Sequence, residues 1–391
     1  MSEWKKIKLS ECCSSISDGD HQPPPKAETG IPFITISNMT STNQLDFSDT
    51  LYVPQNYYDG LDSKRKARKD DILYSVVGSF GIPIFMKENR EFVFQRHIAI
   101  LRPEAKKIIP RFLYYVMLTK DFYAKADAAA IGAAQRTVSL TALRNMIVTI
   151  PDRPQQEKIV NTLASYDDLI ENNQKQIKLL EEAAQRLYKE WFVDLRFPGY
   201  EKTEIVDGVP VGWKKKRLID LADVQYGYAF DGSLFNAQKE GMPIIRIRNI
   251  PIGTTEDYTT ETADSQYIIH NGDIVVGMDG EFHINSWCGE DSYLVQRTCC
   301  MRPYDDKMKG WFLIAINEPI KYFEKTVVGA TVAHLGKKHI DTIELLTGPD
   351  DLLIPFENMF KKRQILLNQN ILLCEARDRL LPKLMSGEIE L

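Results

Sequence analysis

The chain of 391 residues has no apolar run of about 18 residues, the length that a membrane-spanning helix needs. Its start, from Met1 to Ser10, is polar and rich in lysine, unlike the apolar segment of a secretory signal. The six cysteines include no Cys-x-x-Cys pair, and the adjacent pairs Cys12-Cys13 and Cys299-Cys300 have poor spacing for a metal or a disulfide. We therefore predict a cytoplasmic protein with buried, reduced thiols.

Patterns that carry catalysis or bind metals are also missing. The six histidines show no metal-ligand spacing, and the acidic residues do not join them in a catalytic arrangement. One weak candidate, Asp152 followed by Glu157-Lys158, lies at a predicted helix start, where acidic residues and Pro151 are expected anyway. We therefore predict that the chain is not an enzyme by itself and holds no metal.

The net charge of −5 argues at first against a nucleic-acid binder. The basic residues are concentrated, however, in the runs Lys64-Arg65-Lys66, Lys214-Lys215-Lys216-Arg217 and Lys361-Lys362-Arg363. Because local potential steers a polyanion, these runs are compatible with phosphate contacts. The alternative, that they are ordinary solvated surface lysines, stays open.

What the sequence does contain is a duplication. Short patterns return in the same order: Trp4-Lys5-Lys6 as Trp213-Lys214-Lys215, Gly30 and Asn38 as Gly241 and Asn249, Asp71-Ile72 as Asp273-Ile274, Gln95-Arg96 and Arg102 as Gln296-Arg297 and Arg302, and Glu182-Ala183 as Glu375-Ala376. Each copy of a repeat forms one structural unit. We expect two tandem domain-plus-helix units, and hence two similar sites for one pseudo-symmetric ligand.

Each copy begins with short β-rich runs and ends in a long helix. Residues 1 to about 150 and about 214 to 348 are broken by Gly, Pro and Asn, whereas Arg111 to Ala130 has helical periodicity. Gln155 to Phe192 contains neither Gly nor Pro and predicts one long helix. A second helix starts near Pro355, and we expect Pro382 to end or kink it.

Both helices carry heptad stripes. The first has Leu163, Ile170, Ile177, Ala184 and Trp191 on one seam and Tyr166, Asn173, Leu180 and Leu187 on the other; the second has Phe356, Met359, Leu366, Leu373, Leu380 and Leu384. Asn173 is the kind of seam residue that fixes register. Because neither stripe can be buried alone, we predict an intramolecular antiparallel coiled coil. Contact with a second protein stays open, and the two arrangements are compatible.

The suggestive chemistry is that of binding, since phosphates attract Lys and Arg while base edges attract bidentate Arg, Asn and Gln. Side chains of these kinds beside Gly-rich turns make the following candidates: Lys64, Arg65, Lys66, Ser79, Phe80, Arg96, Gln135, Arg136, Arg246, Arg248, Asn249, Glu281, Arg297, His334, Lys337 and Lys338.

Each candidate has a structural alternative. Arg246 and Arg248 alternate with isoleucines and could form the solvated face of a strand. Gln95-Arg96 and Gln296-Arg297 recur, so they could serve the shared fold. Positions that differ between the copies should discriminate bases, and we give most weight to Gln135-Arg136 against Ala333-His334.

The whole chain resembles the specificity subunit of type I restriction-modification systems. The motifs that carry the resemblance are Asp18-Gly19-Asp20-His21, Gly227-Tyr228-Ala229-Phe230, the linker from Gly208 to Trp213, and the helix end Glu182-Ala183 with Arg186-Leu187. Each motif is weak alone, but their order extends over nearly the whole chain. In the second helix, Asn370 and Arg377 interrupt the seam, which departs mildly from the family pattern.

The resemblance implies an α+β chain with two tandem α/β target recognition domains, at residues 1–153 and 213–353. A linker at 193–212 would follow the first spacer helix, 154–192, and the second spacer helix would be 354–391. At ~1.5 Å per residue, the first helix spans ~55 Å, or about one and a half turns of a DNA duplex. Each domain is then expected to read one half of a split double-stranded DNA site.

The resemblance also implies partners. Two methyltransferase subunits would dock on the chain and methylate adenine with S-adenosylmethionine, and a motor-nuclease subunit that uses ATP and magnesium can join to cut unmodified DNA. This chain lacks the Asn/Asp-Pro-Pro-Tyr/Phe motif of the methyltransferase, so it is expected to bind no cofactor itself. Two other readings stay open: a fragment of a stand-alone DNA methyltransferase, and a coiled-coil scaffold without a DNA role.

Overall fold

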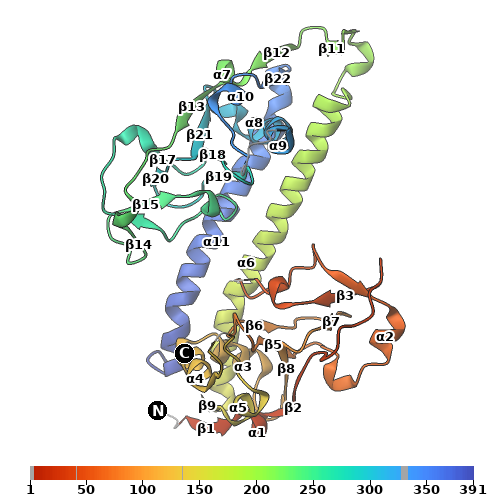
Figure 1. Ribbon diagram of the computed structural model, residues 1–391, viewed down its shortest axis with the longest axis vertical. Coiled ribbons are helices and arrows are strands. Elements are labelled where there is room, and N and C mark those ends of the chain that lie inside the picture. Colours follow the sequence, from red (N-terminus) through yellow and green to blue (C-terminus); the bar gives the residue numbers. More distant parts are fainter. Residues whose placement is uncertain (1–3, 41, 134, 327–332) are drawn as a thin grey trace. The chain divides into compact units, whose positions relative to one another are not determined.

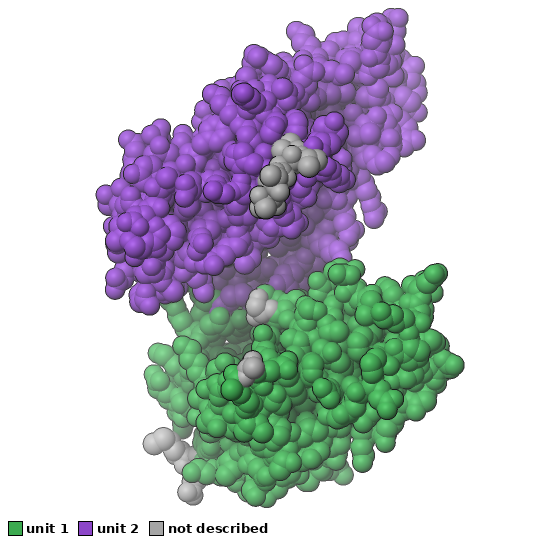
Figure 2. Space-filling model, in the orientation of Figure 1, with its two compact units in different colours: residues 1–167, 375–391 green, residues 168–374 purple. Residues whose placement is uncertain are grey.

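The computed structural model describes residues 4–40, 42–133, 135–326 and 333–391. It divides into two compact units, drawn in green and purple in Figure 2. Unit 1 contains Met1–Asp167 and Glu375–Leu391, and unit 2 contains Asp168–Cys374. Each unit mixes strands and helices, and the two long helices contribute a segment to each (Figure 1).

Unit 1 begins with short strands and ends in helices. Its elements are β1 (Lys5–Lys8), α1 (Leu9–Cys12), β2 (Cys13–Asp18), β3 (Ile31–Ile34), η1 (Ile36–Asn38), β4 (Leu51–Val53), α2 (Gln55–Asp59), η2 (Ser63–Arg65), β5 (Ile72–Ser75), β6 (Pro83–Phe85), β7 (Val93–Phe94), β8 (Ile98–Pro103), α3 (Pro110–Met117), α4 (Lys120–Ala129), α5 (Leu140–Asn145), β9 (Ile147–Ile150) and the start of α6 (Arg153–Tyr188).

Unit 2 starts with the rest of α6 and, after a short hairpin, follows the same plan. Its elements are the π-turn η3 (Lys189–Val193), η4 (Tyr200–Lys202), β10 (Ile205–Val206), β11 (Val209–Pro210), β12 (Lys214–Arg217), α7 (Leu218–Leu221), β13 (Ala222–Tyr226), η5 (Gly232–Leu234), β14 (Phe235–Asn236), β15 (Met242–Ile245), η6 (Ile247–Asn249), β16 (Tyr258–Thr259), η7 (Ser265–Tyr267), β17 (Ile268–Ile269), β18 (Ile274–Gly277), β19 (Ile284–Ser286), β20 (Ser292–Leu294), β21 (Thr298–Pro303), η8 (Asp306–Met308), α8 (Lys309–Ala315), α9 (Asn317–Thr326), α10 (Lys337–Ile340), β22 (Glu344–Thr347), η9 (Asp350–Leu353) and most of α11 (Ile354–Ser386).

The two units repeat one sheet topology. In unit 1 the antiparallel sheet has the order β2-β8-β5-β6, and in unit 2 the order is β13-β21-β18-β19. A second sheet contains β4-β3-β7 in unit 1 and the corresponding β16-β15-β20 in unit 2. In both, the outermost basic strand pairs with the last strand of the unit, β1 with β9 and β12 with β22. The repeated sequence patterns therefore correspond to repeated folds.

The central strand of each unit is buried on both faces, which explains its unbroken apolar sequence. In β5, Ile72 and Tyr74 pack into a core with the helices, while Leu73 packs on the other face against the second sheet. In β18, Ile274 and Val275 divide between two cores in the same way.

The helical segments differ from the sequence expectation in three details. The stretch Arg111 to Ala130 forms two helices, because Thr119 accepts a hydrogen bond from the Phe122 backbone amide and caps a new start. The first long helix begins at Arg153 and, after Tyr188, continues as the π-turn Lys189–Val193. Pro382 lies inside α11 and does not end it, since only the last turn follows.

Within each unit, the segments of α6 and α11 contact each other in antiparallel order. In unit 2, Asn173 donates to Asn370 at 3.0 Å, and Trp191 packs edge-on against Phe356 with ring centroids 6.0 Å apart. In unit 1, Leu163 shares a core with Leu384. The seam residues predicted from the heptads are buried (Leu163, Ile170, Asn173, Ile177, Leu366, Leu384) or partly buried (Leu180, Leu187, Trp191, Leu373, Leu380).

The two polar interruptions of the second seam have polar partners on the first helix. Asn370 meets Asn173 in unit 2, and in unit 1 Arg377 donates to Asp167 at 3.0 Å. The interruptions therefore pair side chains of α11 with side chains of α6, in the way that a register-fixing contact requires.

None of the helices in the described ranges is both long and apolar enough to cross a membrane.

Candidate nucleic-acid interfaces

An ion pair supports the loops of each unit, buried in unit 1 and half-buried in unit 2. In unit 1, Arg102 donates from Nη2 to Asp71 at 2.9 Å, and its guanidinium also binds the Lys66 carbonyl oxygen at 2.9 Å. In unit 2, Arg302 donates from Nη2 to Asp273 at 2.6 Å. Because these pairs occupy matching places in matching strands, they belong to the shared fold and not to sequence reading.

Main-chain hydrogen bonds hold the same three loops together in each unit. In unit 1, the amides of Val76, Gly78 and Val138 donate to His97, Arg136 and Val76. In unit 2, the amides of Met278, Gly280 and Leu335 donate to Arg297, Ala333 and Met278. We call each set of three segments a loop frame. The loop frame of unit 1 contains residues 76–81, 95–97 and 135–138, and that of unit 2 contains residues 278–283, 295–297 and 333–335. Since only backbone atoms make these bonds, the frames accept different side chains at matched positions.

The loop frames correct the sequence alignment by one residue. His97 accepts from Val76 as Arg297 accepts from Met278, so Arg297 corresponds to His97 and not to Arg96. Arg96 corresponds instead to Gln296, since their backbone amides donate to equivalent carbonyl oxygens, those of Asp20 and Tyr228. The apparent repeat of Gln-Arg therefore does not place arginines at matched positions.

The same shift affects the last loop. The Arg136 carbonyl corresponds to that of Ala333, so Thr137, and not Arg136, corresponds to His334. The two units thus present different side chains on equivalent backbone. A difference between Gln135-Arg136 and Ala333-His334 was expected. The sequence paired Arg136 with His334, however, whereas the structure pairs Arg136 with Ala333.

In unit 1 the frame carries an aromatic and guanidinium stack. The Phe80 ring stacks on Tyr123 with ring centroids 5.7 Å apart. The Arg136 guanidinium lies 5.6 Å from the Phe80 ring centroid and forms an ion pair with Asp127. Gly81 is required here, because a Cβ at this position would lie 2.6 Å from the Tyr123 ring. Ser79 and Gln135 are exposed beside the stack.

Arg96 lies at the edge of a separate cavity of unit 1. The cavity has a volume of about 340 Å³ and is lined by Asp20, His21, Arg96, His97 and the prolines that follow His21. Burial and the neighbouring Arg96 lower the pKa of His97. The cavity therefore places a neutral imidazole beside an exposed guanidinium.

In unit 2 the frame carries a polar network centred on Asp279. One carboxylate oxygen pairs with Arg297, and the other lies 2.5 Å from His334 Nδ1. Burial raises the pKa of Asp279, but the hydrogen bonds from His334 and Arg297 outweigh burial, so the pKa is lowered. Asp279 therefore stays ionised and holds two side chains from two other loops.

The remaining candidates of unit 2 divide into exposed and buried residues. Glu281 is exposed near Lys321, at 4.0 Å, and Lys337 and Lys338 are exposed on the four-residue helix α10. Phe282, which matches Phe80, is fully buried instead of stacked at the surface. The loop tips of the two units therefore differ in both charge and aromatic exposure.

The basic run of unit 1, Lys64 to Lys66, is at least partly exposed to solvent. Lys66 donates to the Asp59 carbonyl oxygen at 2.9 Å and lies 4.8 Å from the Tyr58 ring centroid, both uncharged partners. Lys64 is exposed, and Arg65 lies 3.8 Å from Asp20. The run is thus available for phosphate contacts.

Three further candidates lie in η6 or at its start, also outside the loop frames. Asn249 is buried and caps η6, accepting from the Arg246 amide at 2.8 Å, as Asn38 does for Thr35 in unit 1. This duplicated cap assigns Asn249 a structural role. Arg248 pairs with Asp257, and Arg246 packs 5.7 Å from the Phe235 ring centroid.

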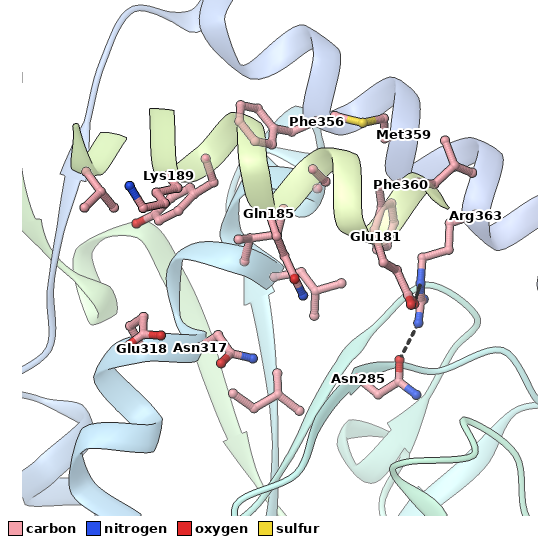
Figure 3. Close-up of a pocket in the computed structure, with 18 residues that line it drawn as sticks. Glu181, Gln185, Lys189, Asn285, Asn317, Glu318, Phe356, Met359, Phe360 and Arg363 are labelled. Atoms are coloured by element: carbon pink, nitrogen blue, oxygen red, sulfur yellow. Dashed lines mark hydrogen bonds and ion pairs between the residues drawn. The ribbon is translucent and has the colours of Figure 1, made fainter. Parts of the chain in front are cut away.

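A larger cavity of unit 2, of about 600 Å³, lies between α6, α8 and the start of α11 (Figure 3). Arg363 reaches across its edge to Asn285 at 2.8 Å and to Glu181 at 2.6 Å. Burial raises the pKa of Tyr188, on its wall, to about 12. The lining includes neither His nor Cys, and among the described residues no cluster of His, Cys, Asp and Glu could hold a metal.

Sequence reasoning missed Tyr123, Asp127 and Asp279. Asp279 is separated from Arg297 and His334 by 18 and 55 residues, so no local pattern joins them. The only local sign of this site in the sequence is Gly280, which follows Asp279 and indicates a turn.

The chain matches known proteins over most of its length. The type I restriction modification DNA specificity domain matches residues 1–182 and 210–349. The HindI specificity subunit of Haemophilus influenzae is 23% identical, with 100% of both chains covered. The MjaIX specificity subunit of Methanocaldococcus jannaschii is 25% identical over 72% of this chain and 69% of the relative.

The fold also matches a solved structure. The S subunit of a type I restriction-modification system from M. genitalium aligns with a TM-score of 0.60 at 16% identity, covering 98% of this chain and 96% of that one. At that identity the likeness concerns the fold alone, which agrees with the duplicated topology described above. Together with the domain match, it means that this chain belongs to the type I restriction modification DNA specificity family and is a specificity subunit of such a system.

Proposed function

We propose that unit 1 and unit 2 each read one half of a bipartite double-stranded DNA site. The observation that carries this proposal is the pair of loop frames, in which equivalent backbone presents different exposed side chains. A shared frame suits two half-sites of similar shape, and the differing side chains suit different base sequences. Domains at 1–153 and 213–353 would be the two target recognition domains.

We further propose that α6 and α11 act over their whole lengths as an antiparallel coiled-coil spacer, with 193–212 as the linker. The contacts that support this are those of Asn173 with Asn370 in unit 2 and of Asp167 with Arg377 in unit 1. In this arrangement the chain works in the cytoplasm as a non-catalytic scaffold. Two methyltransferase subunits with S-adenosylmethionine would modify adenine, and a motor-nuclease subunit with ATP and magnesium could join them.

The test is to co-express the chain with its methyltransferase partner and to map methyladenine in the host DNA. We expect one motif with two fixed half-sites and a spacer of constant length. Methylation by the purified chain alone would contradict the non-catalytic role. A complex that methylates without any sequence motif would contradict DNA reading by this chain.

Exchanging residues 1–150 for the equivalent segment of a relative should change one half-site and leave the other half-site and the spacer intact. The reason is that the segment contributes a complete loop frame and most residues of the cores of unit 1. The measurement is the methyladenine motif of the chimera. A change in both half-sites would show that the units do not read independently.

Arg136→Ala should relax sequence preference, whereas replacing Lys64, Arg65 and Lys66 by Gln should weaken binding to every sequence. A lost bidentate base contact costs roughly 1–3 kcal/mol of discrimination. The slope of log affinity against log salt is negative, and each lost phosphate contact reduces its magnitude by about 0.9 for duplex DNA. Binding is measured on cognate and scrambled duplexes over a range of salt. If Arg136→Ala weakens both duplexes equally, Arg136 contacts the backbone.

A further inference from the structure

The network of Arg297, Asp279 and His334 has no counterpart at the matched positions of unit 1, all of which the structure describes. The loop frames place His97, Val77 and Thr137 at the same three positions. Val77 cannot hold a cation, so the side chains of unit 1 are not joined there. The network is therefore an addition to the shared fold and is not needed to close the frame.

The geometry of the network orients two side chains toward solvent. The Asp279 side chain is only 12% exposed, whereas those of Arg297 and His334 are 69% and 58% exposed. A nearly buried carboxylate thus fixes two exposed groups at their inner atoms, Arg297 Nη1 and His334 Nδ1. This is the arrangement that holds a recognition side chain in one rotamer before its ligand arrives.

The backbone conformation of Arg297 also indicates that its side chain has a role in recognition. Its φ is +67°, a left-handed conformation that glycine adopts easily and that an arginine side chain makes less favourable. The matching His97 is not in this conformation. Arg297 occupies this position against its backbone preference, which points to a role of the side chain.

We propose that Arg297 and His334 read a G·C base pair in the half-site of unit 2, with Asp279 as their positioning residue. This inference rests on the proposed function. With Nη1 bound to Asp279, Arg297 presents Nη2 and Nε, which can donate to guanine O6 and N7. When Nδ1–H donates to the carboxylate, His334 Nε2 faces outward and can accept from a cytosine N4 amino group.

The charge of Asp279 favours a contact of Arg297 with a base over a contact with a phosphate. The ionised Asp279 offsets the charge of Arg297, which weakens its attraction for a phosphate, but the outward N–H donors remain. Lys337 and Lys338, which are exposed on α10 three and four residues after His334, are the better phosphate ligands of this region. The network therefore contributes specificity, and the lysines contribute affinity.

The experiment gives unit 2 the residues of unit 1 in the full chain, co-expressed with the methyltransferase partner. The triple variant D279V/R297H/H334T should lose a G·C requirement at one position of one half-site, by about 5- to 150-fold in discrimination. The other half-site and the spacer should not change. The control is Arg196→Ala, which removes an exposed, ion-paired guanidinium of the same unit outside the loop frame and should leave the motif intact.

Single variants separate reading from folding and from charge. Arg297→Gly suits the left-handed backbone, so it should lower discrimination without lowering the melting temperature. Arg297→Lys keeps the charge but loses the planar fork, so it should relax the same position and retain non-specific affinity. Asp279→Asn should relax that position too, whereas a merely structural residue would change stability alone.

A modified base identifies the contact. Replacing the guanine by 7-deazaguanine should weaken wild-type binding and should have little further effect on Arg297→Gly. If the triple variant keeps the wild-type motif, or if Arg297→Gly weakens cognate and scrambled duplexes equally, the inference is overturned. A wild-type complex that shows no two-part motif would instead overturn the proposed function.

Discussion

Arg102→Ala should destabilise unit 1 more than any other single substitution proposed for this chain, by about 3–5 kcal/mol. The side chains of Arg102 and Asp71 are only 9% and 2% exposed, and their atoms lie 2.9 Å apart. Removal of the guanidinium leaves the Asp71 carboxylate buried without its charge partner. The substitution also removes the hydrogen bond from Arg102 to the carbonyl oxygen of Lys66, which helps to hold the basic run in place.

Unit 2 supplies the matched control. Arg302 makes the same ion pair with Asp273, but its side chain is 30% exposed, so water can solvate the carboxylate after truncation. Arg302→Ala should therefore cost clearly less than Arg102→Ala. Hydrogen exchange followed peptide by peptide distinguishes the units, since protection should fall in β5 and β8 for the first variant and in β18 and β21 for the second. Equal losses would show that burial does not decide the cost.

The parts of the fold that could be predicted from the sequence rest on local or repeated patterns. A helix from Gln155 to Phe192 follows from its heptads, and α6 covers Arg153–Tyr188 because the apolar stripe and the lack of Gly and Pro act over short distances. The duplication predicted a repeated fold, and both units have the same strand order. An end of the second helix at Pro382 was wrong, since α11 runs on to Ser386 and Leu384 packs into the core of unit 1. A kink at Pro382 stays a prediction.

The candidate site could be predicted only at the level of loops. Loop lengths differ between the copies, so the match of Gln95-Arg96 with Gln296-Arg297 by residue identity placed Arg297 opposite the wrong residue. The main-chain bond from Met278 to Arg297 gives the correct correspondence, and it cannot be inferred from side-chain identity. Asp279 was not named at all, because a carboxylate acquires its role here from partners that are distant in sequence.

Shortening both long helices together should change the spacing of the methylated motif, because we propose that they form the spacer. Residues 170–173 of α6 and 370–373 of α11 are the matched segments, since Asn173 contacts Asn370 and the numbering runs in opposite directions. Deleting both segments shortens each helix by ~6 Å, close to two base pairs, at ~1.5 Å per residue. The deletion also rotates one end against the other by roughly 40°.

The sense of this rotation decides whether the variant stays active. Both the α-helix and B-DNA are right-handed, so with the spacer parallel to the duplex, loss of four residues and loss of two base pairs rotate the two ends in the same sense. Two base pairs correspond to roughly 70°, at about 10 base pairs per turn. The mismatch is then about 30°, which a twist of the DNA spacer can absorb. We therefore expect a motif with unchanged half-sites and a spacer two base pairs shorter.

Deleting seven residues, 168–174 with 369–375, is the contrasting variant. It keeps the heptad seam, since Ile177 then takes the place of Ile170, and shortens each helix by ~10 Å, close to three base pairs. Its rotation is about 20° in the opposite sense, whereas three base pairs rotate by roughly 105°. This variant should fold and yet lose methylation through mis-phasing. An active four-residue variant that methylates the original motif with its original spacer would show that α6 and α11 do not set the distance.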